Sequence, residues 1–329
     1  MKKVSALFLV AVLLLSAVLS GCSRKDSPVN GSAGEKTGKN DKLTIVATIF
    51  PPYDFARQIT GGKAGVTMLL PPASESHSFE PTPQDIITIQ NCDVFIYVGG
   101  ESDQWVNKVL ASMDTSKIKI ITLMDCVDVV EEETVEGMQP EEGEESEPEQ
   151  AEEPEYDEHV WTSPQNAMRI VQKISDALCT ADTVNAAYYQ ANTAAYLSQL
   201  SQLDAEFRDV VAHAQRKTIV FGDRFPFRYF TEAYGLQYYA AFPGCSTDTE
   251  ANAQTVKFLV DKIKAEKIPV VFHIELSNQK MAEAISEATG AKVLLLHACH
   301  NISKDDFEKG IGYVDLMKKN VASLKEALQ

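Results

Sequence analysis

Short, continuous apolar runs recur along most of this chain, and segments with helix-start signals or helical spacing separate them. Runs of this kind indicate strands that are buried on both faces, and strands that alternate with helices form parallel sheets. The pattern therefore predicts an α/β fold. The expected strands are at 43–48, 66–70, 93–98 and 118–123 in the first half, and at 218–221, 236–242, 268–274 and 291–297 in the second.

The longest uninterrupted helical pattern lies between these halves. Residues 182–215 contain neither proline nor glycine. Large apolar side chains recur there every three or four residues, at Tyr196, Leu200, Leu203, Phe207 and Val210. A helix over this range would be about 50 Å long at about 1.5 Å per residue. We therefore predict two Rossmann-like parallel-sheet lobes, residues 42–181 and 216–329, joined by one long rigid helix, 182–215.

The N-terminal segment differs from the rest in composition. Two lysines precede an apolar run at 4–19, which is too short and poorly flanked for a transmembrane helix and is typical of a signal peptide. The run ends in Leu-Ser-Gly-Cys at 19–22, which resembles the lipobox of bacterial lipoproteins. The resemblance implies removal of residues 1–21 and a lipid anchor on Cys22 at the extracytoplasmic side of the cell membrane. A plain secretory signal is the alternative. Residues 22–41, rich in Ser, Gly, Lys and Asn, are expected to be a flexible tether.

Most of the formal net charge of -17 comes from residues 131–158, which hold fifteen acidic residues and neither Lys nor Arg. Dense like charge with few apolar residues predicts a disordered acidic loop. Such a loop either gathers cations by long-range attraction or is merely a solvated insert, and both interpretations stay open. The rest of the chain has no basic stripe, so nucleic acid is not expected as a partner.

Two histidines of the first half occupy matching settings. His77 lies in PPASESHSFEPTPQD, which follows the apolar run 66–70 and ends in a helix-start signal, and His159 lies in DEHVWTSP before another helix. Both should therefore lie on loops at the carboxyl edge of a parallel sheet, where open α/β sheets bind ligands. Two histidines on such loops indicate a metal site.

The motifs HSFEPTPQD and EHVWTSP resemble those of the metal-binding lipoproteins that serve ABC importers for zinc or manganese, the zinc type in particular. The likeness covers nearly the whole mature chain. Further matching positions are Tyr188, Asn192, Tyr196, Leu200, Leu203, Asp204, Gly312, Tyr313, Met317 and Asn320. The resemblance implies two lobes with a metal in the cleft between them and two ligands from each lobe, with His77 and His159 as the first pair.

The second pair departs from the family pattern. The third-ligand position falls on Gly222, which has no side chain, and Asp223 is the nearest replacement. The last position falls in LHACHN, which makes His297 and His300 candidates, and Glu275 is a candidate ligand or orienting carboxylate. Three imidazoles and a fourth ligand suit Zn²⁺, whereas carboxylate-rich sites suit Mn²⁺. We therefore expect bound Zn²⁺, with Mn²⁺ as the alternative.

Other interpretations of these residues stay open. His297 could be a core histidine, and His300 could orient a ligand instead of being one. His273 lies within an apolar run and is expected in the core or the cleft wall, and Asp223 is expected to pair with Arg224.

The cysteines show no CxxC spacing, which excludes a disulfide scaffold and a thiolate zinc module. Cys245 and Cys299 both follow predicted strands and could form a bridge in an extracytoplasmic protein. Cys299 also lies between two candidate ligands, where a thiolate would bind zinc.

The interpretation that combines these features is a monomeric, lipid-anchored receptor that is not an enzyme. It would capture Zn²⁺ and deliver it to an ABC permease, and the lipid anchor would be its only contact with the membrane. A zinc hydrolase is a rival, but the chain has no HExxH motif. An adhesin with an incidental metal is a second rival.

Overall fold

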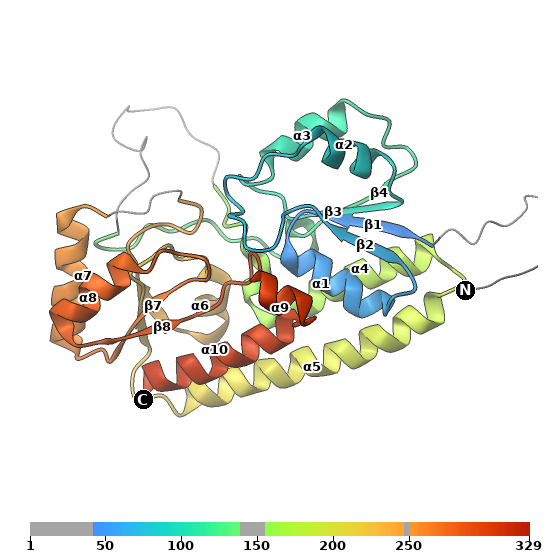
Figure 1. Ribbon diagram of the computed structural model, residues 1–329. Coiled ribbons are helices and arrows are strands. Elements are labelled where there is room, and N and C mark those ends of the chain that lie inside the picture. Colours follow the sequence, from blue (N-terminus) through green and yellow to red (C-terminus); the bar gives the residue numbers. More distant parts are fainter. Residues whose placement is uncertain (1–41, 139–154, 247–250) are drawn as a thin grey trace, which may run out of the picture. The chain divides into compact units, whose positions relative to one another are not determined.

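The computed structural model describes residues 42–138, 155–246 and 251–329 (Figure 1). The predicted signal peptide, Cys22, the tether and residues 139–154 of the acidic segment lie outside these ranges. Among the described helices, none combines the length and the apolar character needed to cross a bilayer.

The first half of the described chain contains a parallel sheet of four strands in the order β2-β1-β3-β4. The strands are β1 (Thr44–Ala47), β2 (Gly65–Met68), β3 (Val94–Tyr97) and β4 (Lys119–Thr122). The helices between them are α1 (Phe50–Thr60), α2 (Pro83–Gln90) and α3 (Gln104–Ala111). A capping box fixes the start of α2, because Thr82 and Asp85 each accept a hydrogen bond from the other's backbone N–H.

The second half repeats this topology. Its strands are β5 (Thr218–Val220), β6 (Gln237–Tyr239), β7 (Val270–His273) and β8 (Lys292–Leu295), paired in parallel as β5-β6 and β7-β8. A parallel bridge between Phe221 and Phe272 links the two pairs, so the order becomes β6-β5-β7-β8. The helices are α6 (Arg228–Tyr234), α7 (Ala253–Glu266), α8 (Lys280–Thr289), α9 (Lys304–Glu308) and α10 (Tyr313–Leu328). The predicted two-lobe α/β fold is confirmed.

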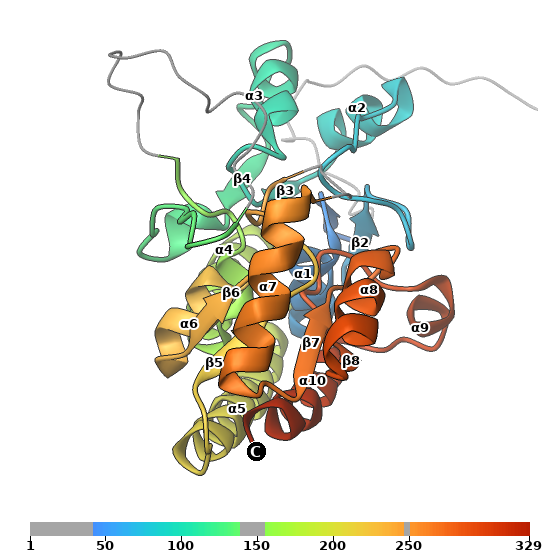
Figure 2. The ribbon, with the colours of Figure 1, turned by 90° about the vertical axis from the view of Figure 1, so that its left-hand side faces the viewer.

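The helix predicted at 182–215 is α5 (Ala186–Ala212), and a separate helix, α4 (Pro164–Ala181), precedes it. With 27 residues, α5 is about 40 Å long, shorter than predicted. Asp182 explains the difference: its carboxylate accepts hydrogen bonds from the Asn185 side chain at 2.7 Å and from the Tyr189 hydroxyl at 2.7 Å, which fixes a turn before α5 begins. Helix α5 packs against α1 and α4 at one end and against α6 and α10 at the other (Figures 1 and 2). The lobe boundaries at 181 and 216 remain predictions.

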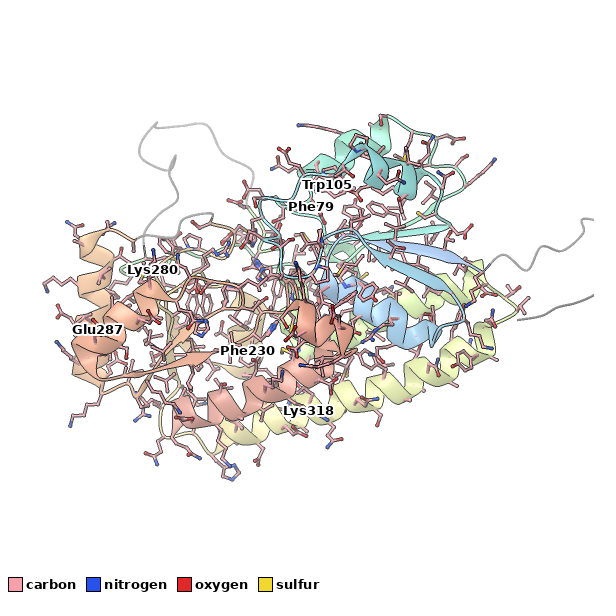
Figure 3. The ribbon with its side chains drawn as sticks, in the orientation of Figure 1. Phe79, Trp105, Phe230, Lys280, Glu287 and Lys318 are labelled. Carbon is pink, nitrogen blue, oxygen red and sulfur yellow. The ribbon has the colours of Figure 1, made fainter. Side chains whose placement is uncertain are left out.

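One hydrophobic core runs through both halves. It contains Phe55 from α1, Leu200 from α5, Phe230 from α6 and Tyr313 from α10, all nearly or fully buried. A smaller cluster lies beneath α2 and α3, where Phe79 and Trp105 meet edge to face with ring centroids 5.8 Å apart (Figure 3). The two lobes therefore share their main core.

The described ends of the acidic segment are ordered, so the predicted disorder is wrong for residues 131–138 and 155–158. Glu131 and Tyr156 form an antiparallel bridge, and the backbone N–H of Glu132 donates to the carbonyl of Glu155 at 2.9 Å. Val135 and Met138 pack against the main core. The prediction rested on the dense charge of the segment, whereas these few apolar side chains bury enough surface to stabilise its ends.

Candidate metal site

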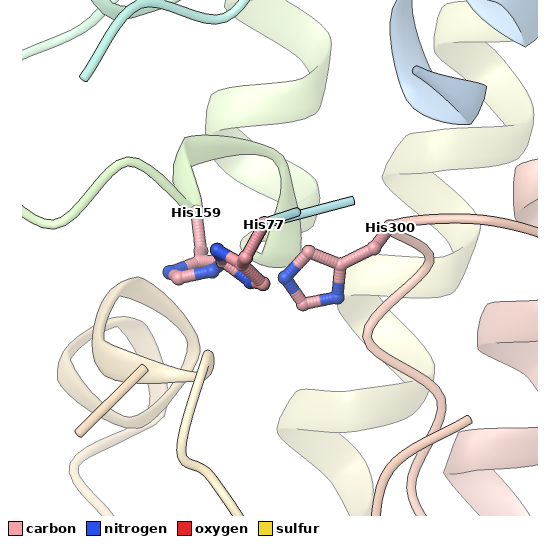
Figure 4. Close-up of side chains that lie close together, drawn as sticks. All are labelled: His77, His159 and His300. Atoms are coloured by element: carbon pink, nitrogen blue, oxygen red, sulfur yellow. The ribbon is translucent and has the colours of Figure 1, made fainter. Parts of the chain in front are cut away.

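Three histidines converge where the two lobes meet (Figure 4). His77 lies in the loop between β2 and α2, and His300 lies in the loop between β8 and α9. His159 immediately precedes the short 3₁₀ turn Val160–Thr162. One ring nitrogen of each lies within 4.8 Å of one from both others. The ring centroids are 5.7 Å apart for His77 and His159, 5.2 Å for His77 and His300, and 4.7 Å for His159 and His300.

Each histidine is held through Nδ1 by an oxygen. His159 Nδ1 lies 3.0 Å from Asp157 Oδ1, and His300 Nδ1 lies 3.4 Å from Glu275 Oε1. Because an ionised carboxylate only accepts hydrogen bonds, these contacts assign the ring proton to Nδ1 in both residues.

His77 reaches a carboxylate through a hydroxyl. Its Nδ1 lies 2.8 Å from Ser102 Oγ, and that hydroxyl donates its hydrogen to Glu158 Oε1. The Ser102 oxygen is therefore left to accept a hydrogen bond from His77 Nδ1–H. All three histidines thus carry the proton on the same ring nitrogen.

The other nitrogen, Nε2, is buried in His77, His159 and His300 and has no hydrogen-bond partner within the described residues. A buried polar atom without a partner costs free energy, so three such atoms on neighbouring rings require an explanation. Metal-binding histidines characteristically bond a carboxylate or carbonyl through one nitrogen and bind the ion through the other. The arrangement fits a zinc ion bound by three Nε2 lone pairs.

The electrostatic environment keeps two of the rings neutral. Burial lowers the pKa of His77 well below its usual value, and the neighbouring His300 and His159 lower it further. Burial also lowers the pKa of His300, although its hydrogen bond to Glu275 opposes the shift. In His159 burial acts in the same direction, but the negative charge and hydrogen bond of Asp157, together with Glu158 and Glu132, outweigh it and raise the pKa.

His297 does not join the three histidines, although the sequence made it a candidate. Its Nδ1 accepts a hydrogen bond from the backbone N–H of Cys299 at 3.0 Å, which leaves the ring proton on Nε2. Asn320 fixes its backbone, accepting from the His297 N–H and donating to its carbonyl, both at 2.8 Å. The chain then turns at Cys299, whose φ is +64°, so His300 points to the site and His297 does not.

Glu275 and Asp223 also have other roles. Glu275 accepts the backbone N–H groups of Ala298 at 2.7 Å and His300 at 2.8 Å, contacts that suit an orienting carboxylate. Asp223 accepts the backbone N–H groups of Ile274 and Arg224 at 3.1 and 2.9 Å. Neither residue belongs to a described cluster of potential metal ligands.

Packing requires the glycine at position 222, where the resemblance placed the third ligand. A Cβ on Gly222 would lie 2.7 Å from the Ala282 Cα of α8, a distance that excludes any side chain. The predicted pairing of Asp223 with Arg224 is wrong, because the Arg224 guanidinium donates to the two Glu75 carboxylate oxygens at 3.3 and 3.1 Å. Since Glu75 lies on the His77 loop, this ion pair joins the second lobe to the first.

The remaining predictions concern buried residues. His273 is buried on β7 with its Nδ1 2.8 Å from the Ile274 carbonyl, as expected for a core histidine. Cys245 and Cys299 are both free, so the possible bridge between them does not form. Cys299 is fully buried in the main core, whereas Cys245 lies near His77 and Glu158.

Sequence reasoning missed Ser102, Asp157, Glu158 and Cys245. The two acids directly precede His159, and that adjacency was a usable signal, because residues next to a ligand can reach its ring. Ser102 carried no signal, since it meets Glu158 only through the fold, 56 residues away.

Comparisons with known proteins point in one direction. A family model described as "Zinc-uptake complex component A periplasmic" matches residues 45–327. The "High-affinity zinc uptake system protein ZnuA" of Bacillus subtilis is 34% identical, with 99% of this chain and 98% of that protein covered. The "Zinc-binding lipoprotein AdcA" of Streptococcus pneumoniae is 30% identical over 99% of this chain, which spans 61% of AdcA. The structure of the Zn(II)-bound ZnuA-like domain of AdcA superposes with a TM-score of 0.72 at 29% identity and covers 87% of this chain and 99% of that domain.

Proposed function

The chain belongs to the ZnuA family of zinc-uptake components, and from that premise we propose that it captures Zn²⁺ with His77, His159 and His300 and delivers the ion to an ABC permease. The family consists of solute-binding components and not of enzymes, which removes the hydrolase alternative. Zinc is thus the cargo of this protein and not the cofactor of a reaction.

The observation that carries the proposal is a cluster of three histidines with ring nitrogens within 4.8 Å of one another, in which every Nε2 is buried and has no hydrogen-bond partner among the described residues. Neutral imidazole is a ligand that zinc favours, whereas manganese favours carboxylate and carbonyl oxygen. The oxygens closest to the rings are already engaged on the Nδ1 side, so the face presented to the ion is nitrogen. The zinc-binding relatives support the same ion.

Delivery requires the protein to stay beside its permease. We propose that Cys22 carries the lipid anchor and that residues 23–41 tether a monomeric body on the extracytoplasmic side. Two acyl chains anchor a protein stably where one does not. The AdcA relative is named a lipoprotein, which supports this placement.

Zinc titration of single variants tests the ligand set. His77→Ala, His159→Ala and His300→Ala should each lower the zinc affinity by orders of magnitude in calorimetry, while the circular dichroism spectrum stays that of the native protein. His213→Ala is the matched control, because its ring lies at the end of α5 with its side chain 78% exposed. His297→Ala should bind zinc as tightly as the native protein. Native affinity in all three ligand variants would refute the proposal.

A further inference from the structure

A cysteine from the second lobe lies beside the histidine cluster. Cys245 is buried in the loop after β6, next to Gly244. The backbone N–H of Gly244 donates to Glu132 Oε1 at 2.8 Å, which fastens this loop to the ordered part of the acidic segment. A Cβ on Gly244 would lie 2.9 Å from His159 Cε1, so only glycine lets the loop approach the ring this closely.

The Cys245 sulfur lies beside His77, at one edge of the histidine cluster. Its Sγ, a carboxylate oxygen of Glu158 and a ring nitrogen of His77 all lie within 4.8 Å of one another. His77 therefore belongs to two groups of potential ligands, one completed by the other two histidines and one by Cys245 and Glu158. Within the described residues no other cysteine joins such a group.

Three histidines leave a tetrahedral zinc ion one ligand short. Glu158 is occupied, because its Oε2 accepts the Ser102 backbone N–H at 2.9 Å and its Oε1 accepts the Ser102 hydroxyl. Glu275 is likewise committed to two backbone N–H groups and to His300. Among the described members of the two groups of potential ligands, the thiol of Cys245 is the donor for which no such hydrogen bond to the framework is found.

We propose that Cys245 supplies the fourth ligand, as a thiolate, to the zinc ion that His77, His159 and His300 hold. The inference rests on the proposed function and adds the residue that completes the coordination. On binding, a zinc–sulfur bond replaces the S–H bond and the proton passes to water, with no change of oxidation state. A thiolate also makes the site softer, so it discriminates further against manganese and other oxygen-seeking ions.

Cobalt(II) is the probe that tests this ligand, because thiolate bound to cobalt gives an intense near-ultraviolet charge-transfer absorption that nitrogen and oxygen ligands do not give. The protein without its signal peptide should carry Cys22→Ser, so that no thiol of the N-terminal segment contributes. With one equivalent of Co²⁺ this protein should show the band. Cys245→Ser should bind Co²⁺ without the band and lose about tenfold or more in zinc affinity.

The matched control is Cys126→Ser, because Cys126 is a half-buried free cysteine of the first lobe whose Sγ contacts the Thr122 carbonyl. This variant should keep both the band and the zinc affinity. A second measurement does not depend on any cysteine variant: bound zinc should protect Cys245 from alkylation, as read by mass spectrometry.

The outcomes separate the two proposals. Stoichiometric Co²⁺ binding without the band, or alkylation of Cys245 at the same rate with and without zinc, would overturn the thiolate ligand and leave the three-histidine receptor standing. Failure to bind either ion would overturn the proposed function itself.

Discussion

Replacing Asp157 with asparagine tests whether the protein itself orients His159, one of the proposed zinc ligands. The carboxylate Oδ1 accepts two hydrogen bonds from the same residue, from His159 N at 2.7 Å and from His159 Nδ1 at 3.0 Å. Asparagine keeps the size but removes the charge, which weakens both bonds and the basicity of the ring. Losing a carboxylate behind a metal-binding histidine typically costs 10–100-fold in affinity, about 1.4–2.7 kcal/mol.

The assay is a competition titration of zinc against a chromophoric chelator at pH 7.5, with native protein, Asp157→Asn and His159→Ala. Asp157→Asn should lie between the other two. Asp128→Asn is the matched control, because it makes the same chemical change in an ion pair with Arg169 in which the Asp128 side chain is 97% exposed. If Asp157→Asn binds zinc as tightly as the native protein while His159→Ala does not, then Nδ1 has no supporting role and the tautomer assignment is wrong.

Three further predictions concern pH, the acidic segment and the junction of the lobes. Because the pKa of His159 is raised and those of His77 and His300 are lowered, falling pH should protonate His159 first. Zinc titrations from pH 8 to 5 should therefore show the affinity beginning to fall above pH 6.5. Asp157→Asn removes the charge that raises the pKa of His159, so it should move this fall to lower pH. Removing residues 139–154 should leave the tight site intact in calorimetry, since every proposed ligand lies outside them, whereas a cut from 131 to 155 would also remove Val135 and Met138 from the core. The buried carboxylate of Asp54 binds Arg57 at 2.6 Å and accepts the Tyr313 N–H at 2.8 Å. Asp54→Ala should therefore lower the free energy of unfolding in urea by about 3–5 kcal/mol. An unchanged midpoint would contradict this.

The halves of the fold could be predicted because buried parallel strands have a local signature. Each apolar run contains or overlaps a strand, including β6, where a seven-residue run yields a strand of only three residues. The strand order is not local, and neither is the bridge between Phe221 and Phe272 that joins the second sheet. Helix α9 was not predicted. Ser303 caps it by accepting the Asp306 N–H, but a helix of 5 residues is too short to add a periodic apolar pattern to that capping signal.

The site likewise combines residues that a local motif identifies with residues that only the fold brings together. His77 and His159 are carried by motifs, so their positions followed from sequence. The choice between His297 and His300 depended on a left-handed turn at Cys299 and on Asn320, twenty-three residues further along the chain. The spacing of residues along the sequence could not reveal the turn at Cys299 or the contact with Asn320. It also could not show that Cys245, and not Cys299, is the cysteine that lies beside His77.

The shared core has a consequence for how the molecule melts. Side chains from α1, α5, α6 and α10 pack together in one cluster, so unfolding of either lobe disrupts the main core of both. Calorimetry should therefore record a single cooperative transition in place of two. Saturating zinc should shift that transition upward as one peak, because an ion bound only by the native state stabilises everything that unfolds with it.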